Sequence, residues 1–258
     1  MVVDFGKTAS DYAKHRAGFP DLFFDRLFKD GIVAKGARVL DLGTGTGTVA
    51  RGLAKRHCRV TALDPSEPML DQAKALANSE RVDIQFVQAR AEETYLPNGS
   101  FDVVTAGTCW LWFEKPKAVL EAQRVLKPLG RLVIANLDWL PRPGSVVQAT
   151  EKLIKAHNPP WDGDDGTGIY PGWLADLSQA GFIDIESFSL DVSLPYSHEG
   201  WLGRIRASAG VAASQPPDTV ERFNSAHREM LARDFPGEPL QIPHRVFAVH
   251  ARTPSAVT

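Results

Sequence analysis

A short apolar segment that runs directly into closely spaced glycines is the feature that most constrains the fold of this chain. Residues 39–42 read Val-Leu-Asp-Leu, and Gly43, Gly45 and Gly47 follow at alternate positions. Glycines allow a tight turn with positive φ and a close approach of the backbone to a ligand. Residues 48–56 then have the pattern of a helix. A buried strand, a glycine turn and a helix in this order predict a ligand-binding loop of an α/β sheet.

The spacing of these glycines argues against two common nucleotide sites. The dinucleotide fingerprint places its third glycine five residues after the first, but that position here is Thr48. No Gly-Lys-Ser or Gly-Lys-Thr follows, so the loop does not match a phosphate-binding P-loop. An NAD-dependent oxidoreductase therefore remains only an alternative hypothesis.

Apolar segments of strand length alternate with helical segments over the first half of the chain. The predicted strands are 37–42, 59–64, 84–87, 101–106 and 130–135, and the predicted helices are 48–56, 68–78 and 117–126. This alternation predicts a parallel sheet covered on both faces. We therefore expect an α/β fold, a doubly wound, Rossmann-like, mostly parallel seven-stranded sheet with helices on both faces, plus a helical and loop lid.

The second half of the chain is less regular, and Trp, Pro, Gly and Asp become frequent after residue 136. It predicts helices at 172–180, 199–213 and 217–233, strands at 183–194 and 245–251, and a proline-interrupted loop at 236–243. Neither an internal repeat nor a linker is visible. We expect one domain over 1–258, with an N-terminal flap and helix at 1–35, a cofactor-binding core at 36–136, and lid segments with sheet-completing strands at 137–258.

Charge and composition narrow the class of protein further. The 258 residues hold 29 basic and 31 acidic side chains, a net charge of −2, without the basic excess of a nucleic-acid binder. Two cysteines make a disulfide framework improbable, and no run approaches the roughly 20 apolar residues of a membrane span. The first residues lack the apolar core of a signal peptide. We expect a cytoplasmic protein with no nucleic-acid or membrane partner, and the sequence leaves its oligomeric state open.

Asp64 lies 21 residues after Gly43, at the end of the second predicted strand. A carboxylate at this position can accept hydrogen bonds from both hydroxyls of a ribose. A single acidic residue here can also cap the helix that follows. The glycine loop beside it favours ribose binding, which would serve any adenosine ligand.

Five segments together resemble a known family. They are Asp41-Leu42-Gly43-Thr44-Gly45-Thr46-Gly47, Leu63-Asp64-Pro65-Ser66-Glu67-Pro68-Met69-Leu70, Ala89-Arg90-Ala91-Glu92, Ser100-Phe101-Asp102-Val103-Val104 and Arg124-Val125-Leu126-Lys127-Pro128-Leu129-Gly130-Arg131-Leu132. In this order and spacing they resemble the class I S-adenosylmethionine-dependent methyltransferases, in the small-molecule branch called type 11. Residues 12–20, 168–171 and 195–199 are also similar to that branch, so the resemblance covers nearly the whole chain.

The resemblance implies S-adenosyl-L-methionine as cofactor and assigns residues to it. The glycine loop would approach its methionine part, Asp64 its ribose, and the segment after the third strand its adenine. Many members have Asp where this chain has Arg90, which removes an expected side-chain bond to adenine. Arg16 is either a partner for the cofactor carboxylate or an exposed surface charge. The implied cofactor-binding residues are Tyr12, Arg16, Asp41, Gly43, Thr44, Gly45, Asp64, Pro65, Met69, Arg90, Ala91, Glu92 and Thr108.

Catalytic residues are not identified by the sequence. Many relatives have His where this chain has Leu111, so a base cannot be transferred to that position. His157 and His198 are candidate bases, and the seven histidines form no short-spaced pair that predicts a metal site. Aromatic residues in such segments serve as packing more often than as substrate contacts. The candidate substrate residues are Trp110, Trp139, Trp161, Tyr170 and Arg204.

These observations predict a methyltransferase acting on a small organic molecule by in-line displacement, with catalysis mainly by positioning. A non-catalytic S-adenosylmethionine-binding protein is the main alternative, favoured by Leu111 at the histidine position. The acceptor atom is not determined, since one fold supports many reactions.

Overall fold

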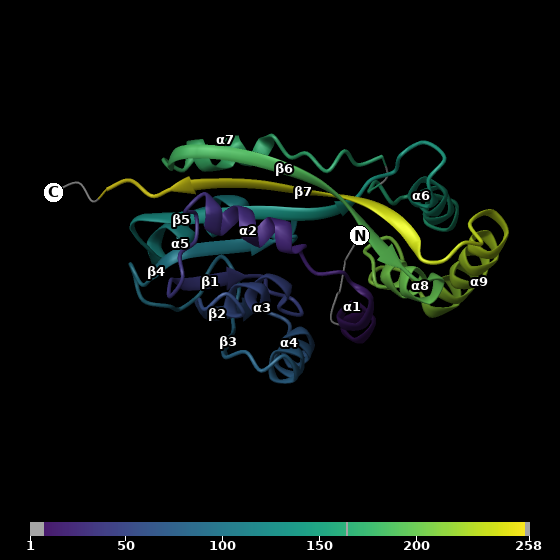
Figure 1. The fold of residues 1–258 in the computed structure, drawn as a ribbon, viewed down its shortest axis with the longest axis horizontal. Coiled ribbons are helices and arrows are strands. Elements are labelled where there is room, and N and C mark those ends of the chain that lie inside the picture. Colours follow the sequence, from purple (N-terminus) through teal and green to yellow (C-terminus); the bar gives the residue numbers. More distant parts are fainter. Residues whose placement is uncertain (1–7, 164, 256–258) are drawn as a thin grey trace. The chain divides into compact units, whose positions relative to one another are not determined.

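The computed structural model describes residues 8–163 and 165–255, apart from the side chain of Tyr12. Its centre is a seven-stranded sheet in the order β3-β2-β1-β4-β5-β7-β6 (Figure 1). The strands are β1 (Arg38–Leu42), β2 (Arg59–Asp64), β3 (Ile84–Gln88), β4 (Phe101–Gly107), β5 (Leu126–Trp139), β6 (Ile183–Tyr196) and β7 (Leu240–Arg252). The first five pair in parallel. The strand order on either side of β1 and β4 is that of a doubly wound fold, as predicted.

By contacts within the chain, the protein divides into two compact units. We call the first the sheet unit, which comprises Gly18–Leu137, Ile169–Leu190 and Val246–Thr258. We call the second the helical unit, which comprises Met1–Ala17, Asp138–Gly168 and Asp191–Arg245. Strands β5, β6 and β7 begin in one unit and end in the other. The expected single domain stays a prediction.

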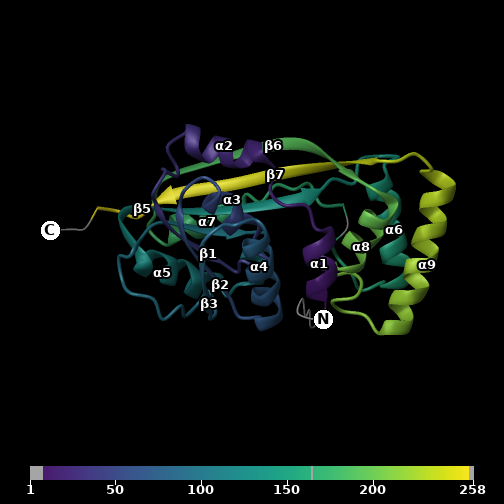
Figure 2. The ribbon, with the colours of Figure 1, turned by 60° about the horizontal axis from the view of Figure 1, so that its bottom comes forward.

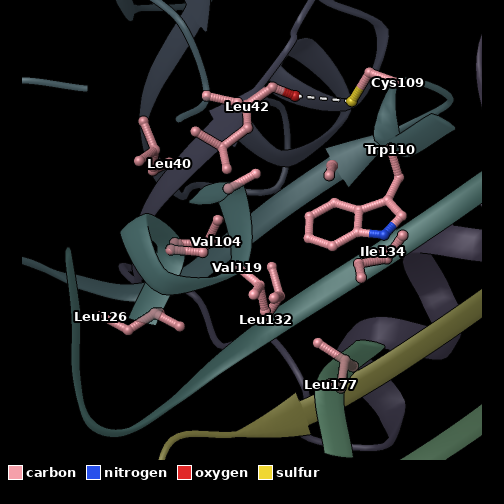
Figure 3. Close-up of a cluster of buried hydrophobic side chains, with 14 of the residues drawn as sticks. Leu40, Leu42, Val104, Cys109, Trp110, Val119, Leu126, Leu132, Ile134 and Leu177 are labelled. Atoms are coloured by element: carbon pink, nitrogen blue, oxygen red, sulfur yellow. Dashed lines mark hydrogen bonds between the residues drawn. The ribbon is translucent and has the colours of Figure 1, made fainter. Parts of the chain in front are cut away.

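In the sheet unit, helices alternate with the parallel strands. They are α2 (Asp21–Lys29), α3 (Thr48–Ala54), α4 (Glu67–Ser79), α5 (Lys115–Val125) and α7 (Gly172–Gln179). Strand residues such as Leu40 and Leu132 pack with Val119 of α5 and Leu177 of α7 in one fully buried cluster (Figure 3). Each buried leucine or valine side chain contributes about 1.5–3 kcal/mol to folding. This apolar core fixes the positions at which the strands end.

The helical unit contains α1 (Ala9–His15), α6 (Val146–His157), α8 (His198–Arg206) and α9 (Pro217–Asp234). Figure 2 shows α8 between α1 and the pair formed by α6 and α9. Its apolar core includes Val147, Ile154 and Trp201. Ser145 and Ser197 begin α6 and α8 by accepting hydrogen bonds from backbone N–H groups three residues later.

Most predicted elements are present, but several boundaries differ and one helix was not predicted. Helix α6 was not predicted, because its Val146-Val147 start disfavours a helix in isolation and only burial of that face stabilises it. The helix predicted for 199–213 ends at Arg206. The helix predicted for 117–126 ends at Val125, since Leu126 already begins β5. The loop predicted for 236–243 is wrong over its last residues, because β7 begins at Leu240 and passes through Pro243. The carbonyl of Pro243 still accepts the N–H of Leu140, at 2.8 Å.

Candidate cofactor site at the carboxyl ends of the strands

The glycine loop leaves β1 in a conformation that requires glycine. Gly43, Gly45 and Gly47 all have positive φ, at 57°, 54° and 80°. A Cβ on Gly43 would lie 2.9 Å from the Cβ of Cys109, so this glycine is required by packing. A Cβ on Gly45 would meet nothing within 4 Å, so the backbone there borders open space. The loop is therefore packed on one side and accessible at Gly45, as a close backbone approach to a ligand requires.

Asp41 lies in β1 directly beneath this loop and is only 1% exposed. One carboxylate oxygen accepts the hydroxyl of Thr44 and the other accepts the hydroxyl of Thr105, each at 2.6 Å. Burial raises the pKa of Asp41 to about 6, and the two hydroxyl donors oppose that rise. Asp41 thus ties the glycine loop to β4. Its expected contact with the cofactor stays a prediction.

Asp64 ends β2 and holds the other side of the loop. Its Oδ2 accepts the backbone N–H of Gly45 at 2.8 Å, and its Oδ1 accepts the N–H of Ser66 at 2.9 Å. Burial raises the pKa of this carboxyl, while the two N–H donors lower it. A carboxylate oxygen can accept about two hydrogen bonds, so each oxygen retains capacity for one more. Asp64 therefore has the acceptors that a ribose diol requires.

The residues expected near adenosine follow β2 and β3. Met69 is buried in α4, and Pro65 is exposed, with its carbonyl accepting the side-chain amide of Gln88 at 3.2 Å. Ala91 is buried, at 3% exposure. Arg90 lies 3.4 Å from Glu92, whose other oxygen accepts the N–H of Glu114 at 2.8 Å, before α5. Glu92 thus fastens the loop after β3 to the start of α5.

Strand β4 ends beside the loop in an unusual backbone conformation. Thr108 has φ of 60°, which a β-branched residue adopts only at a cost of about 1–3 kcal/mol. Its hydroxyl is buried and has no hydrogen-bond partner within the described residues. The next residue, Cys109, donates its thiol to the Leu42 carbonyl at 3.1 Å (Figure 3). Strain at such a position is typical of a functional site.

Two candidate substrate residues of the sheet unit lie in packed surroundings. Trp110 is 1% exposed and donates its indole N–H to Asp176 at 3.1 Å. Tyr170 stacks on Trp173, with ring centroids 4.3 Å apart, and its hydroxyl accepts from Asn136 at 2.9 Å. Both therefore contribute to the fold of the sheet unit, and a role in substrate binding stays a prediction.

The remaining candidates belong to the helical unit. The guanidinium of Arg204, a residue only 7% exposed, lies over the ring of Trp139 at 4.7 Å. Trp139 donates to the buried carboxylate of Glu151 at 2.7 Å. Trp161 is buried in the apolar core of this unit. The guanidinium, indole and carboxylate form one partly buried polar group that sequence reasoning did not assemble.

Both histidine candidates and the N-terminal candidates also lie in the helical unit. His157 Nδ1 is 3.0 Å from the Leu153 carbonyl, and His198 Nε2 is 2.9 Å from the Phe235 carbonyl. Arg16 is partly buried just after α1. The side chain of Tyr12 lies outside the described residues. The structure thus groups Asp41, the glycine loop, Asp64 and Thr108 in the sheet unit. The histidine and N-terminal candidates belong to the helical unit.

Sequence reasoning missed Thr105 and the backbone N–H of Ser66. Asp41 and Thr105 are register partners in the parallel pair β1 and β4. Aligning the predicted strands at their carboxyl ends would have placed this threonine beside the aspartate. No comparable signal exists for Ser66, because a backbone N–H carries no side-chain pattern.

Within the described residues, no group of His, Cys, Asp and Glu could hold a metal ion. Over the same residues, none of the helices combines the length and apolar character needed to cross a membrane.

The fold and the loop between Asp41 and Asp64 define a class I, Rossmann-like methyltransferase architecture, and comparison with known proteins agrees. Residues 40–134 match the family described as methyltransferase domain. A demethylmenaquinone methyltransferase from Clavibacter sepedonicus is 32% identical over 64% of this chain and 73% of its own length. An uncharacterized methyltransferase from Mycobacterium tuberculosis is 33% identical over 57% of this chain, and the chain spans 60% of that relative's length.

Solved structures of low identity share the fold. The YcgJ protein from Bacillus superposes with a TM-score of 0.59 at 21% identity, covering 92% of this chain and 100% of its own. A phosphoethanolamine N-methyltransferase 2 from Haemonchus contortus, solved with S-adenosyl-L-methionine, gives a TM-score of 0.57 at 18% identity, covering 97% of this chain and 57% of its own. The chain belongs to the class I S-adenosylmethionine-dependent methyltransferases of the type 11 branch. S-adenosyl-L-methionine is the cofactor of this class.

Proposed function

We propose that this protein transfers a methyl group from S-adenosyl-L-methionine to a small organic molecule, mainly by positioning the two reactants. The observation that carries the proposal is the pair of carboxylates around the glycine loop. Asp64 presents unused acceptor capacity beside the Gly45 backbone, and Gly45 borders open space. These residues fit a ribose and the methionine part of the cofactor attached to it.

The residues of the loop would divide the work of binding. Asp64 would accept the ribose hydroxyls, and the backbone at Gly43, Thr44 and Gly45 would approach the methionine part. Asp41 would act mainly through Thr44, because both of its oxygens already accept hydroxyl groups. In the same proposal, Met69, Pro65 and the segment from Arg90 to Glu92 border the adenosine. The family resemblance also assigns Tyr12 and Arg16 to cofactor binding.

The bound cofactor supplies a methyl group on a sulfonium, so the protein need not generate an electrophile. Holding two reactants in line is worth about 7–11 kcal/mol of the barrier. A carboxylate, thiolate or neutral amine acceptor would need no base. For a hydroxyl acceptor, His157 and His198 remain the candidate bases, each with one ring nitrogen already directed at a backbone carbonyl.

The direct test is calorimetric titration with S-adenosylhomocysteine. Wild-type protein should bind one equivalent, and Asp64→Ala should lose about ten- to a hundredfold in affinity, the value of a charged hydrogen bond of about 1.5–3 kcal/mol. Asp71→Ala is the matched control, because Asp71 is an exposed carboxylate of α4 that pairs with Lys74. Equal affinity of the Asp64 variant and the control would refute the ribose assignment.

A non-catalytic binding protein is the second candidate, favoured by Leu111, which is 51% exposed at the position where the family resemblance implies a histidine. It predicts binding of S-adenosylhomocysteine without transfer of labelled methyl to any acceptor in a metabolite extract. One methylated product would exclude it.

A further inference from the structure

A hollow lies at the opposite ends of the strands from the glycine loop. It is a cavity of about 480 Å³ in the sheet unit, at the start of β1 and β4. Its lining includes Gly31, Lys35, Asp102, Arg131 and Arg252. Because the glycine loop follows the carboxyl end of β1, a ligand here would not compete with the proposed cofactor.

The two arginines stand directly across from each other on neighbouring strands. Figure 1 shows β7 running opposite to β5, and the N–H of Thr253 donates to the Gly130 carbonyl at 2.9 Å. In an antiparallel pair with this bond, Arg131 of β5 faces Arg252 of β7, with both side chains on one face. Like charges directly opposite destabilise a sheet. Burial, and then the charge of Arg252, lower the pKa of Arg131.

The protein only partly compensates these two charges. Arg131 Nη1 is 3.5 Å from Nδ1 of His250, and Arg252 Nε is 3.7 Å from a carboxylate oxygen of Asp184. That Nε is buried and makes no hydrogen bond within the described residues. Asp184 and Glu186 of β6 favour the charged form of Arg131, by less than burial and Arg252 oppose it. The guanidinium groups therefore keep most of their donors available.

The acidic group that lines the cavity is already occupied. Asp102 accepts the N–H of Arg38 at 2.8 Å through one oxygen and the ammonium of Lys127 through the other. Lys35 is exposed at the rim. Three cationic side chains thus face one neutralised carboxylate, in a chain whose net charge is −2.

We propose that this cavity binds the phosphate group of a small molecule, held between Arg131 and Arg252. A guanidinium offers paired N–H donors that match two phosphate oxygens, and two such groups match a dianion. A bound phosphate would accept from the exposed guanidinium N–H groups of both arginines and would offset the repulsion across the two strands. The source is either inorganic phosphate or a phosphate monoester, since the cavity is larger than one phosphate.

The experiment is calorimetric titration of the full chain with inorganic phosphate and, separately, with glycerol 3-phosphate, at constant ionic strength. One equivalent should bind with an affinity in the millimolar range or tighter. Arg131→Gln and Arg252→Gln should each weaken binding about tenfold or more. Arg142→Gln is the matched control, because Arg142 is an exposed arginine paired with Asp191 in the helical unit. Tighter binding of glycerol 3-phosphate identifies the monoester as the preferred source, and tighter binding of inorganic phosphate identifies the free anion.

Thermal denaturation in phosphate-free buffer separates a binding role from a structural one. Because Arg131→Gln relieves the repulsion, its midpoint should equal or exceed that of the wild type, while phosphate should raise only the wild-type and Arg142→Gln midpoints. A lowered midpoint of Arg131→Gln without phosphate would assign the pair to structure. Equal phosphate binding by the wild type and Arg131→Gln, or none at millimolar concentration, would overturn the proposal.

Discussion

Replacing Thr105 by Val tests whether the hydroxyl on β4 supports the carboxylate beneath the glycine loop. Valine keeps the shape of threonine but removes the donor that lies 2.6 Å from Asp41 Oδ1. Oxygen–oxygen distances in this range mark strong, charge-assisted bonds, worth about 1.5–3 kcal/mol when the acceptor is ionised. The surroundings are buried, so water cannot replace the lost donor.

The same bond affects the protonation of Asp41. Its pKa is about 6, above the usual value for Asp because the carboxyl is buried, and the Thr105 hydroxyl acts to lower it. Loss of about 1.5–3 kcal/mol corresponds to a further rise of about one to two pKa units. A group whose folded-state pKa is raised destabilises the fold as pH rises through that pKa. Thr105→Val should therefore lose the most free energy of unfolding at about pH 8 and much less at about pH 5.

Urea denaturation of wild type, Thr105→Val and Thr105→Ser at these two pH values measures the effect. Serine keeps the hydroxyl and should recover most of the free energy of unfolding that valine loses at the higher pH. A penalty for Thr105→Val that is equal at both pH values would show that packing, and not the bond to Asp41, is responsible. That result would refute the argument.

Three further predictions, made with four variants, test other parts of the structure. Gly43→Ala should lower the thermal midpoint more than Gly45→Ala does, because the Cβ added at Gly43 would lie 2.9 Å from Cys109 while the one added at Gly45 meets open space. The main effect of Gly45→Ala should instead be weaker binding in titrations with S-adenosylhomocysteine. Burial lowers the pKa of His227 to about 3, so this histidine lowers the free energy of unfolding as pH falls below about 6.5. His227→Gln should make the free energy of unfolding, measured by urea denaturation, depend less on pH in this range. An unchanged pH dependence would contradict the prediction. Trp139→Phe removes the donor to buried Glu151 and should cost about 1–3 kcal/mol of unfolding free energy, and no loss would show that the bond is not needed.

The sheet unit could be predicted because buried parallel strands are short apolar runs with polar residues at their ends. Asp41 lies one residue before the end of such a run and Asp64 ends another, so sequence alone placed both near one edge of the sheet. The partners of each carboxylate could not be read in the same way. Thr105 is set beside Asp41 by strand register, and the N–H groups of Gly45 and Ser66 are set beside Asp64 by the turns that follow.

The helical unit was harder to predict because its decisive contacts join residues far apart in the sequence. Helix α6 begins with two valines and is stabilised by burial against α8 and α9, which lie some fifty or more residues later. Thr150 of α6 accepts the indole N–H of Trp201 at 3.1 Å and lies 3.2 Å from Nε2 of His227. Local propensity contains no information about such partners.

The two carboxylates at the ends of β1 and β2 show how neighbours give the same residue type different work. Asp41 holds the side chain of Thr44, and Asp64 holds the backbone of Gly45, so adjacent residues of the loop are fixed from two strands. Asp41 is surrounded by hydroxyl donors and is restricted to organising the loop, whereas Asp64 keeps acceptor capacity. The charge of Asp64 also raises the pKa of Asp41. A ligand that brings positive charge near this pair would therefore favour the ionised form of both, and its affinity should weaken as pH falls below about 6.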